Sequence, residues 1–302
     1  MPGGARFEPK WDGFRALVTC GERVRIWSRQ GNDLSASFPE LVSAAAEQLP
    51  SGAVFDGEIV AWADGRLDFD VLQRRLNVTA ARGRALSRQA PANLVLFDVL
   101  AHGGEDVRAL SFDCRRELLE DVCGQLRPPL SLSPVTEDPH VAAEWFTDLV
   151  HVGVEGLVVK GGAQPYRPAQ RDWVKVKHRE TVDVIVAAVI GSRVAPSACV
   201  VGLVEGGRLR IAGRTTPLKR DQSKELGAIL REPRGPHPWP SEVTLGRFSR
   251  DRSPVAITLV EPVVAEVSAD TARTGGVFRH LVRFGRVRSD LPVPDFDRGS
   301  HA

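Results

Sequence analysis

The chain has 302 residues, of which 42% are hydrophobic and 26% are charged, and its formal net charge is +2. These fractions are typical of soluble globular proteins and exclude a disordered, collagenous or coiled-coil chain. No run of about 18 apolar residues predicts a membrane span, and no apolar segment near the start resembles a signal peptide, so we expect no membrane association.

Up to about residue 178, short β-branched runs alternate with a few helical stretches. Strands are predicted at residues 16–20, 23–28, 53–62, 93–100, 156–161 and 173–178. Helices are predicted at residues 38–49, 70–76, 111–126 and 140–153. This mixture indicates an α+β domain.

From residue 182 the pattern changes to strands, with one helical stretch at 222–232 and a proline-rich loop at 231–242. About five short strands punctuated by Gly and Pro predict a small β-barrel. We therefore expect three parts, with boundaries at 1–180, 181–294 and 295–302, the last a disordered tail.

Cysteine and lysine usage narrows the chemistry. The four cysteines stand singly, without the spacing of a zinc site, so we expect reduced thiols in a cytoplasmic protein. Only six of the 40 basic residues are lysine, and a lysine that persists among so many arginines is a candidate for chemistry that needs an amine. Four of the six lie in the motifs below: Lys10, Lys160, Lys175 and Lys177.

The first motif is EPKWDGFR, residues 8–15. In an extended segment Glu8, Lys10 and Asp12 project to one face. A lysine amine becomes nucleophilic only where its surroundings favour the neutral form, which a bound nucleotide with its divalent cation could do. Asp12 could orient the amine and Arg15 could hold a phosphate or ribose. For these residues alone, a surface ion pair between Lys10 and Asp12 ahead of a turn at Gly13 is the commoner outcome.

Later motifs add carboxylates and cations at strand positions. Asp56 and Glu58 share one face of an apolar strand, where a carboxylate needs a cation, a lysine or a hydroxyl as partner. Glu155 directly precedes the strand predicted at 156–161. It could be a ligand for Mg²⁺, which usually binds through one or two carboxylates plus substrate phosphates. Lys175 and Lys177 share a strand face, and an anion such as a polyphosphate would relieve their repulsion.

Phe97 alternates with buried neighbours in LVLFDVL, residues 94–100. It could stack on a base, although a phenylalanine in such a run more often belongs to the core.

Six motifs in this order resemble the covalent nucleotidyltransferases, and most closely the ATP-dependent DNA ligases related to the ligase domain of bacterial ligase D. They are EPKWDGFR, SRQGNDL (28–34), DGEIVAW, LVLFDVL, GVEGLVVKG and WVKVKH. The resemblance implies an adenylation domain of antiparallel sheets with flanking helices, followed by an oligonucleotide-binding β-barrel. It implies ATP and Mg²⁺ or Mn²⁺ as cofactors.

The same resemblance implies the following roles. Lys10 is adenylated on its side-chain nitrogen, within a nucleotide-binding motif that includes Asp12 and Gly13. Glu8 meets the adenine amino group and Phe97 stacks on the base. Arg15 and Arg29 contact ribose and phosphate, Glu58 contacts ribose or metal, Glu155 holds metal, and Lys175 and Lys177 hold phosphate.

The implied activity is the sealing of nicks in double-stranded DNA, between a 3′-hydroxyl and a 5′-phosphate, in DNA repair and recombination. We expect a monomer that also interacts with other DNA-repair proteins. Arginines in the predicted barrel are candidates for DNA contact: Arg247, Arg250, Arg252, Arg283, Arg286 and Arg288.

The C-terminal motif departs from the family pattern, which has an arginine followed by Asp-Lys that helps pyrophosphate to leave. Here Arg288 and Asp290 are in register, but Leu291 replaces the lysine. Arg283, Arg286 or Arg288 is the candidate substitute. The alternatives are an RNA ligase or RNA-capping guanylyltransferase, which would share the central motifs, and an inactive DNA-binding relative marked by the missing lysine.

Overall fold

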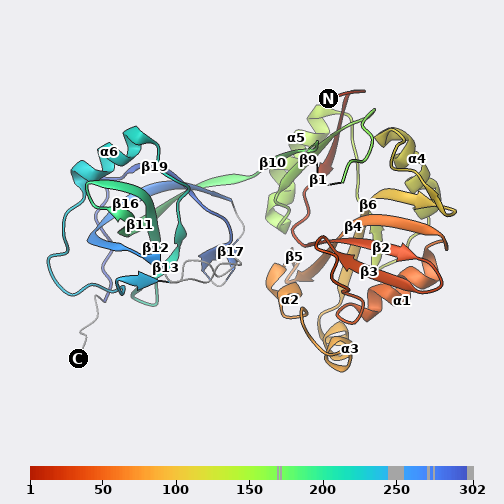
Figure 1. Ribbon diagram of the computed structural model, residues 1–302, viewed down its shortest axis with the longest axis horizontal. Helices are drawn as coiled ribbons and strands as arrows, with labels where there is room; N and C mark the ends of the chain where they lie inside the picture. Colours follow the sequence, from red (N-terminus) through yellow and green to blue (C-terminus); the bar gives the residue numbers. More distant parts are fainter. Residues whose placement is uncertain (169, 171, 244–254, 271–272, 275, 298–302) are drawn as a thin grey trace. The chain divides into compact units, whose positions relative to one another are not determined.

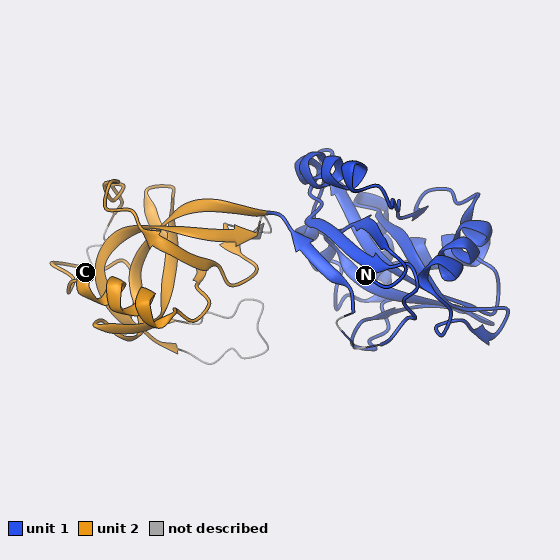
Figure 2. Ribbon diagram, turned by 90° about the horizontal axis from the view of Figure 1, so that it is seen from above, with its two compact units in different colours: residues 1–178 blue, residues 179–302 orange. Residues whose placement is uncertain are grey.

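The computed structural model describes residues 1–297 except 169, 171, 244–254, 271–272 and 275. The chain divides into two compact units, residues 1–178 (unit 1) and residues 179–302 (unit 2) (Figures 1 and 2). Among the helices described, none has the length and apolar character needed to cross a membrane.

Unit 1 is built on a seven-stranded sheet. Its main path runs in the order β3-β2-β4-β6-β7, with β5 paired to β4 and β8 paired in parallel to β6. β4 and β6 are almost continuously apolar and buried, as expected for strands covered on both faces. The strands are β2 (Phe14–Cys20), β3 (Val24–Ser28), β4 (Ala53–Ala63), β5 (Arg66–Leu67), β6 (Ala92–His102), β7 (Glu105–Asp106) and β8 (Leu130–Leu132).

A second sheet of unit 1 contains the lysine motifs. β9 (Gly156–Gly161) lies between β1 (Ala5–Pro9) and β10 (Val174–Lys177), and both pairings are antiparallel. Glu8 lies opposite Val158, and Lys175 lies opposite the same residue from the other side. Three segments that are far apart in the sequence therefore meet around one strand.

Helices pack on these sheets, and most begin at recognisable caps. Ser111 accepts a hydrogen bond at the start of α4, and Thr79 does so at the start of α3. α3 was not predicted from the sequence, because its arginine-rich segment lacks an apolar stripe. The helices are α1 (Pro39–Gln48), α2 (Phe69–Gln73), α3 (Ala80–Gln89), α4 (Phe112–Cys123), α5 (Pro139–Asp148) and the 3₁₀ helix η1 (Leu149–Val152).

Unit 2 is a five-stranded antiparallel barrel in the order β13-β12-β11-β16-β19. An isolated bridge between Thr215, after β13, and Val282, before β19, joins its two edges. One apolar core includes residues of α6, and a second contains Trp239. The elements are β11 (Arg179–Ser192), β12 (Ala195–Glu205), β13 (Arg208–Arg214), α6 (Arg220–Ile229), β16 (Thr258–Asp270) and β19 (Arg283–Val287), with short hairpins β14 (Glu242–Val243) to β15 (Val255–Ala256) and β17 (Arg273–Thr274) to β18 (Val277–Phe278).

The predicted succession of an α+β part and a β-barrel is confirmed. The predicted tail at 295–302 needs a correction at its start, since Phe296 packs against the barrel core and the Asp297 amide donates to the Gly207 carbonyl at 2.8 Å. Residues 298–302 lie outside the described residues. All four cysteines are free, as predicted.

Candidate active site

Backbone hydrogen bonds hold the candidate nucleophile beside its carboxylate. Lys10 follows β1 directly, and its amide donates to the Gly156 carbonyl at 2.8 Å while the Glu155 amide donates to the Lys10 carbonyl at 2.9 Å. The Lys10 Nζ contacts Glu155 Oε2. Gly156 has φ +138°, and a Cβ there would lie 2.1 Å from the Val176 carbonyl oxygen. A glycine is therefore required where β9 begins and approaches β10.

The lysine pair of β10 is divided between two environments. Lys177 Nζ lies 3.3 Å from Glu155 Oε2, so this carboxylate faces two ammonium groups. Lys175 lines the pocket, and no described residue forms an ion pair with it. Partial burial and the nearby charges of Lys10, Arg15 and Arg29 lower the pKa of Lys175. A bound anion would raise this pKa again, in keeping with the predicted phosphate contact.

Glu58 faces this pocket from β4. It lies opposite Arg15 in the β2–β4 ladder, and its carboxylate accepts no hydrogen bond from any residue that the structure describes. Burial raises its pKa to about 8, against the opposing effect of Lys10 and Arg15. Gly13 lets the loop after Lys10 run close to β4, because a Cβ there would lie 2.0 Å from the Ile59 carbonyl oxygen. Glu58 is thus a desolvated carboxylate without a bonded partner among the described residues.

Arg15 is fixed by a neighbouring carboxylate and a phenol. Its Nε and Nη2 donate to Asp56 Oδ1 and Oδ2 at 3.0 and 2.6 Å. The Tyr166 hydroxyl donates to Asp56 Oδ2 at 2.8 Å and accepts from Arg15 Nη2 at 3.2 Å. The guanidinium also lies 4.9 Å from the Trp173 ring centre and 5.6 Å from that of Phe97. Its position in the wall is therefore well defined.

The deepest ion pair joins Glu8 and Lys160. Lys160 Nζ lies 3.0 and 2.8 Å from the two Glu8 carboxylate oxygens and donates to the Phe97 carbonyl at 3.3 Å. Both side chains are at most 3% exposed. The ammonium also lies 4.3 Å from the Trp173 ring centre. Glu8, predicted to meet the adenine amino group, thus has an ammonium partner that the sequence argument did not assign.

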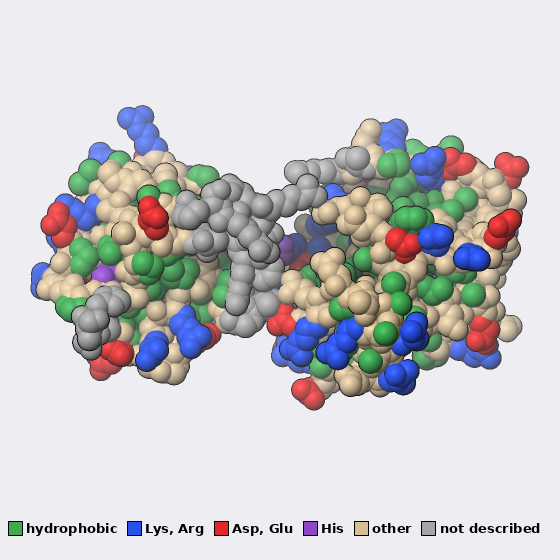
Figure 3. Space-filling view, turned by 60° about the horizontal axis from the view of Figure 1, so that its bottom comes forward, with side chains coloured by type: hydrophobic (Ala, Val, Ile, Leu, Met, Phe, Trp, Pro, Cys, Tyr) green, Lys and Arg blue, Asp and Glu red, His purple; other side chains and the backbone are tan. Residues whose placement is uncertain are grey.

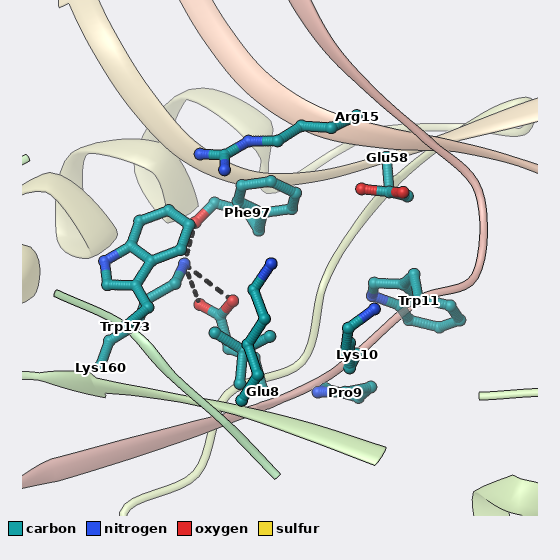
Figure 4. A pocket seen from close by; sticks show the side chains of 11 residues that line it. Glu8, Pro9, Lys10, Trp11, Arg15, Glu58, Phe97, Lys160 and Trp173 are labelled. Atoms are coloured by element: carbon teal, nitrogen blue, oxygen red, sulfur yellow. Dashed lines mark hydrogen bonds and ion pairs between the residues drawn. The ribbon is translucent and has the colours of Figure 1, made fainter. Parts of the chain in front are cut away.

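These groups surround one pocket (Figure 4). Phe97 is 8% exposed and, with Trp173, contributes an aromatic wall below Arg15. Trp11 is held by a 3.0 Å hydrogen bond from its Nε1 to Ser133 Oγ. The lining residues are Glu8, Pro9, Lys10, Trp11, Arg15, Glu58, Phe97, Val158, Lys160, Trp173 and Lys175.

Some predicted residues lie elsewhere in unit 1. Glu155 contacts Lys10, and Lys177 contacts Glu155, but neither residue lines the pocket. The pocket lining also lacks Asp12, Gly13 and Arg29. Arg29 is exposed in the turn after β3. Within the described parts of the chain, no three His, Cys, Asp or Glu side chains converge as a metal site.

The predicted barrel residues form a separate group in unit 2. Arg288 lies 3.1 Å from Asp183, 2.8 Å from Asp290 and 3.7 Å from Glu266, and it lowers the pKa of Asp290 to about 2. Arg286 lies 3.2 Å from Glu266, while Arg283 is exposed. Arg247, Arg250 and Arg252 lie outside the described residues.

The sequence motifs assign no site role to Lys160 and Trp173, which line the pocket, or to Tyr166, which contacts Arg15. Lys160 could have been found, because it is a single charge in an otherwise apolar strand and shares a strand face with Val158. Tyr166 is the only tyrosine of the chain, but it lies in an irregular segment whose path the pattern does not predict. Trp173 opens the WVKVKH motif, but that motif assigned a role only to its lysines.

Comparisons with known proteins identify the family of the chain. The family model described as ATP dependent DNA ligase domain matches residues 1–177. DNA ligase C of Mycobacterium tuberculosis is 32% identical over 96% of this chain and 87% of its own length. The chain belongs to the ATP-dependent DNA ligase family. The ligase relationship predicted from the six motifs is thereby confirmed.

Three other likenesses define the extent of this relationship. DNA ligase C2 of Mycolicibacterium smegmatis is 41% identical over 62% of this ligase, which spans 53% of that relative. The solved ligase domain of M. tuberculosis LigD is 27% identical, with a TM-score of 0.51 and coverage of 95% of this chain and 90% of that one. A solved Lig E DNA ligase, 17% identical with a TM-score of 0.57, supports the fold alone.

Proposed function

We propose that this ligase seals nicks in double-stranded DNA through a covalent AMP on Lys10. The observation that carries the proposal is the position of the Lys10 amine, which lines a pocket with Lys175 and Glu58 and contacts Glu155. A lysine nucleophile needs neighbouring cations and a proton acceptor, and this pocket has both. Family membership supports ATP as the nucleotide.

In the first transfer, the Lys10 Nζ attacks the α-phosphorus of ATP. A phosphorus–nitrogen bond forms, the bond to the bridging oxygen of the β-phosphate breaks, and pyrophosphate leaves. The ammonium must lose a proton, and the contacting Glu155 carboxylate is placed to accept it. Lys175 neutralises phosphate charge from the open side of the pocket, while Lys177 holds Glu155. The reaction thus depends on alignment and charge more than on acid–base chemistry.

The aromatic wall is suited to the base. Phe97 and Trp173 flank the Glu8–Lys160 pair, so a purine stacked there would meet the carboxylate of Glu8 at its edge. Arg15 lies above the same rings and would contact ribose or phosphate. These assignments place the base at the floor of the pocket and the phosphates near Lys10.

The donor set also fits Mg²⁺. Glu58 offers a desolvated carboxylate without a hydrogen-bonded partner among the described residues, and Glu155 offers a second. When bound, the ion would neutralise charge that develops on the transferred phosphate. Glu58 and Glu155 would hold it together with the substrate phosphates.

In the second transfer, a 5′-phosphate oxygen at the nick attacks the phosphorus of lysyl-AMP and Lys10 leaves. In the third, the 3′-hydroxyl attacks that 5′-phosphate and AMP leaves. Both steps need the duplex to reach Lys10, and the barrel of unit 2 is the expected second contact with DNA. We infer a role in DNA repair from this nick-sealing chemistry.

The test is labelling with α-³²P-ATP, followed by identification of the modified peptide and by nick-sealing assays. We expect one AMP per chain on Lys10, no labelling by GTP or NAD⁺, and sealing of nicked DNA in preference to nicked RNA. Labelling by GTP would indicate a guanylyltransferase, and preferred sealing of RNA would indicate an RNA ligase. Absence of any covalent nucleotide would indicate a non-catalytic relative.

A further inference from the structure

A basic surface lies on unit 1, formed by the end of α2 and by α3. The sequence has no Asp or Glu between Asp70 and Asp98, whereas this interval contains five arginines. Four of them are exposed. Figure 3 turns the lower end of Figure 1 toward the viewer and shows Lys and Arg side chains gathered where α2 and α3 lie. The four residues of this basic surface are Arg74, Arg82, Arg84 and Arg88.

The basic surface differs from most arginines of unit 1 in its lack of acidic partners. No ion pair or hydrogen bond joins any of the four guanidinium groups to another described residue. Arg75, between them in sequence, is instead buried and pairs with Glu40. In the described part of the unit, nine arginines lie within 4.0 Å of a carboxylate: Arg6, Arg15, Arg25, Arg75, Arg108, Arg115, Arg116, Arg127 and Arg167.

Local repulsion makes this concentration of charge costly in the free protein. Arg84 and Arg88 are four residues apart on α3, so their like charges share one side of the helix and destabilise it. No acidic residue occurs in α3 to offset them. Bound anions would remove the repulsion, and guanidinium groups match phosphate oxygens through two parallel hydrogen bonds.

Packing makes α3 a fixed support for these side chains. Gly83 is the buried residue of the helix, and a Cβ there would lie 2.2 Å from the Ala36 carbonyl oxygen. The glycine thus lets α3 approach the segment before α1 closely. Thr79 fixes the start of the helix through its side-chain cap on the Arg82 amide. With Gly83 facing inward, Arg82 and Arg84 leave the helix on either side of the contact.

We propose that the basic surface docks the phosphate backbone of duplex DNA, and this inference rests on the proposed nick-sealing function. The chain has a net charge of only +2, so attraction for DNA must come from local surfaces. Duplex DNA carries one negative charge per about 1.7 Å of helix axis, which offers several phosphates to the four guanidinium groups. Such contacts fix position without reading sequence, as a nick-sealing enzyme requires.

The test compares two triple variants of the full chain. Arg82→Gln/Arg84→Gln/Arg88→Gln neutralises α3. Arg23→Gln/Arg108→Gln/Arg127→Gln removes the same charge from exposed positions elsewhere in unit 1. Binding of a nicked DNA duplex is measured by fluorescence anisotropy without ATP and with EDTA, from about 50 to 300 mM NaCl, a range over which phosphate contacts change affinity strongly. This readout does not depend on Lys10 chemistry, so its failure is distinguishable from failure of the proposed activity.

We expect the α3 variant to weaken binding at about 100 mM NaCl by on the order of tenfold. Its salt slope should fall by about 0.9 for each phosphate that is no longer neutralised, hence by nearly 3. The control variant should change both much less. Equal effects in both variants would mean that only the net charge of the chain matters, which would overturn the proposal. An unchanged salt slope in the α3 variant would also overturn it. Failure of the α3 variant to bind an RNA duplex, with DNA binding retained, would assign the surface to RNA and also overturn it.

Self-adenylation of the α3 variant serves as the check on folding. That reaction needs no DNA, and α3 is not among the elements that line the pocket. A variant that accepts AMP normally but seals nicks poorly at about 150 mM NaCl, with recovery at lower salt, would locate the defect at DNA docking.

Discussion

Two regions of the pocket in unit 1 differ in how their charged groups are paired. The floor contains Glu8 and Lys160, and the mouth contains Lys175 and Glu58. At the floor, Lys160 pairs with Glu8, and both side chains are at most 3% exposed. At the mouth, Lys175 has no ion-pair partner among the described residues. Glu58 likewise accepts no hydrogen bond from them.

This difference separates structural charges from those that a substrate can engage. Burial of an ion pair costs desolvation energy, which only well-aligned contacts between the two charges offset. Such a pair therefore fixes the side chains of the floor in one arrangement. Groups without partners at the mouth gain stabilisation only when phosphate or cation arrives, which is the behaviour expected of a binding site. Lys10 stands between the two regions, since Glu155 holds its amine within the pocket.

The largest expected effect is at Lys10. Lys10→Ala should abolish AMP labelling completely, because no other described lysine contacts Glu155 from within the pocket lining. Thermal unfolding should remain cooperative. The matched control is Lys224→Ala, an exposed lysine of α6 in unit 2, which should label like the wild type. Normal labelling of Lys10→Ala would refute the proposed mechanism.

At the floor, removal of one partner should act on stability. Lys160→Met leaves Glu8 buried without its ammonium, and the free energy of unfolding should fall by about 3 to 5 kcal/mol. Urea denaturation measures this decrease. The double variant Glu8→Gln/Lys160→Met should recover part of it, because no unpaired charge remains. A decrease below about 1 kcal/mol for Lys160→Met would mean that the pair is solvated in solution.

The sequence predicted much of this site because strands preserve spacing. Two-residue alternation placed Lys175 and Lys177 on one side of β10, and two carboxylates on one face of an apolar strand pointed to Asp56 and Glu58. The fold class followed from the same periodicity, which predicts an α+β domain in the first part of the chain and a β-barrel in the second.

The remaining parts depend on contacts between distant segments. Nothing local links Lys160 to Glu8, which are 152 residues apart, or Tyr166 to Asp56, which are 110 apart. Helix α3 was missed because its stability comes from the close approach at Gly83 and from a cap, not from an apolar stripe. The expectation that Glu8 contacts the base did not foresee that both of its oxygens contact Lys160.

Glu58→Gln should affect catalysis at the mouth while leaving the floor intact. Removal of an ionised ligand to metal or ribose should raise the barrier to adenylation by about 2 to 4 kcal/mol. Single-turnover labelling at saturating ATP and Mg²⁺ measures it. An unchanged rate would show that Glu58 is a structural carboxylate.

The pH dependence of stability provides an independent measure of Glu58. Its pKa is raised from 4.5 to about 8, so the folded protein retains a proton that the unfolded chain releases. The free energy of unfolding should therefore decrease as the pH rises from 4.5 to about 8, and this contribution should level off above about pH 8. Glu58→Gln should lack this decrease. Parallel wild-type and variant profiles over that range would place the carboxylate in a more solvated environment.

The smallest of these effects should be at Lys175, the cation of the mouth without an ion-pair partner among the described residues. Its partial burial and its neighbours Lys10, Arg15 and Arg29 lower its pKa, so the free protein gains little from this charge. Lys175→Met should leave thermal stability nearly unchanged but raise the KM for ATP in adenylation by on the order of tenfold, as expected when one charged hydrogen bond to phosphate is removed. Lys177→Met is the matched comparison, because it also removes the 3.3 Å ion pair with Glu155 and should lower the labelling rate at saturating ATP. If both variants changed KM and rate equally, the two lysines would share one phosphate-binding role, and Lys177 would have no separate part in holding Glu155 beside Lys10.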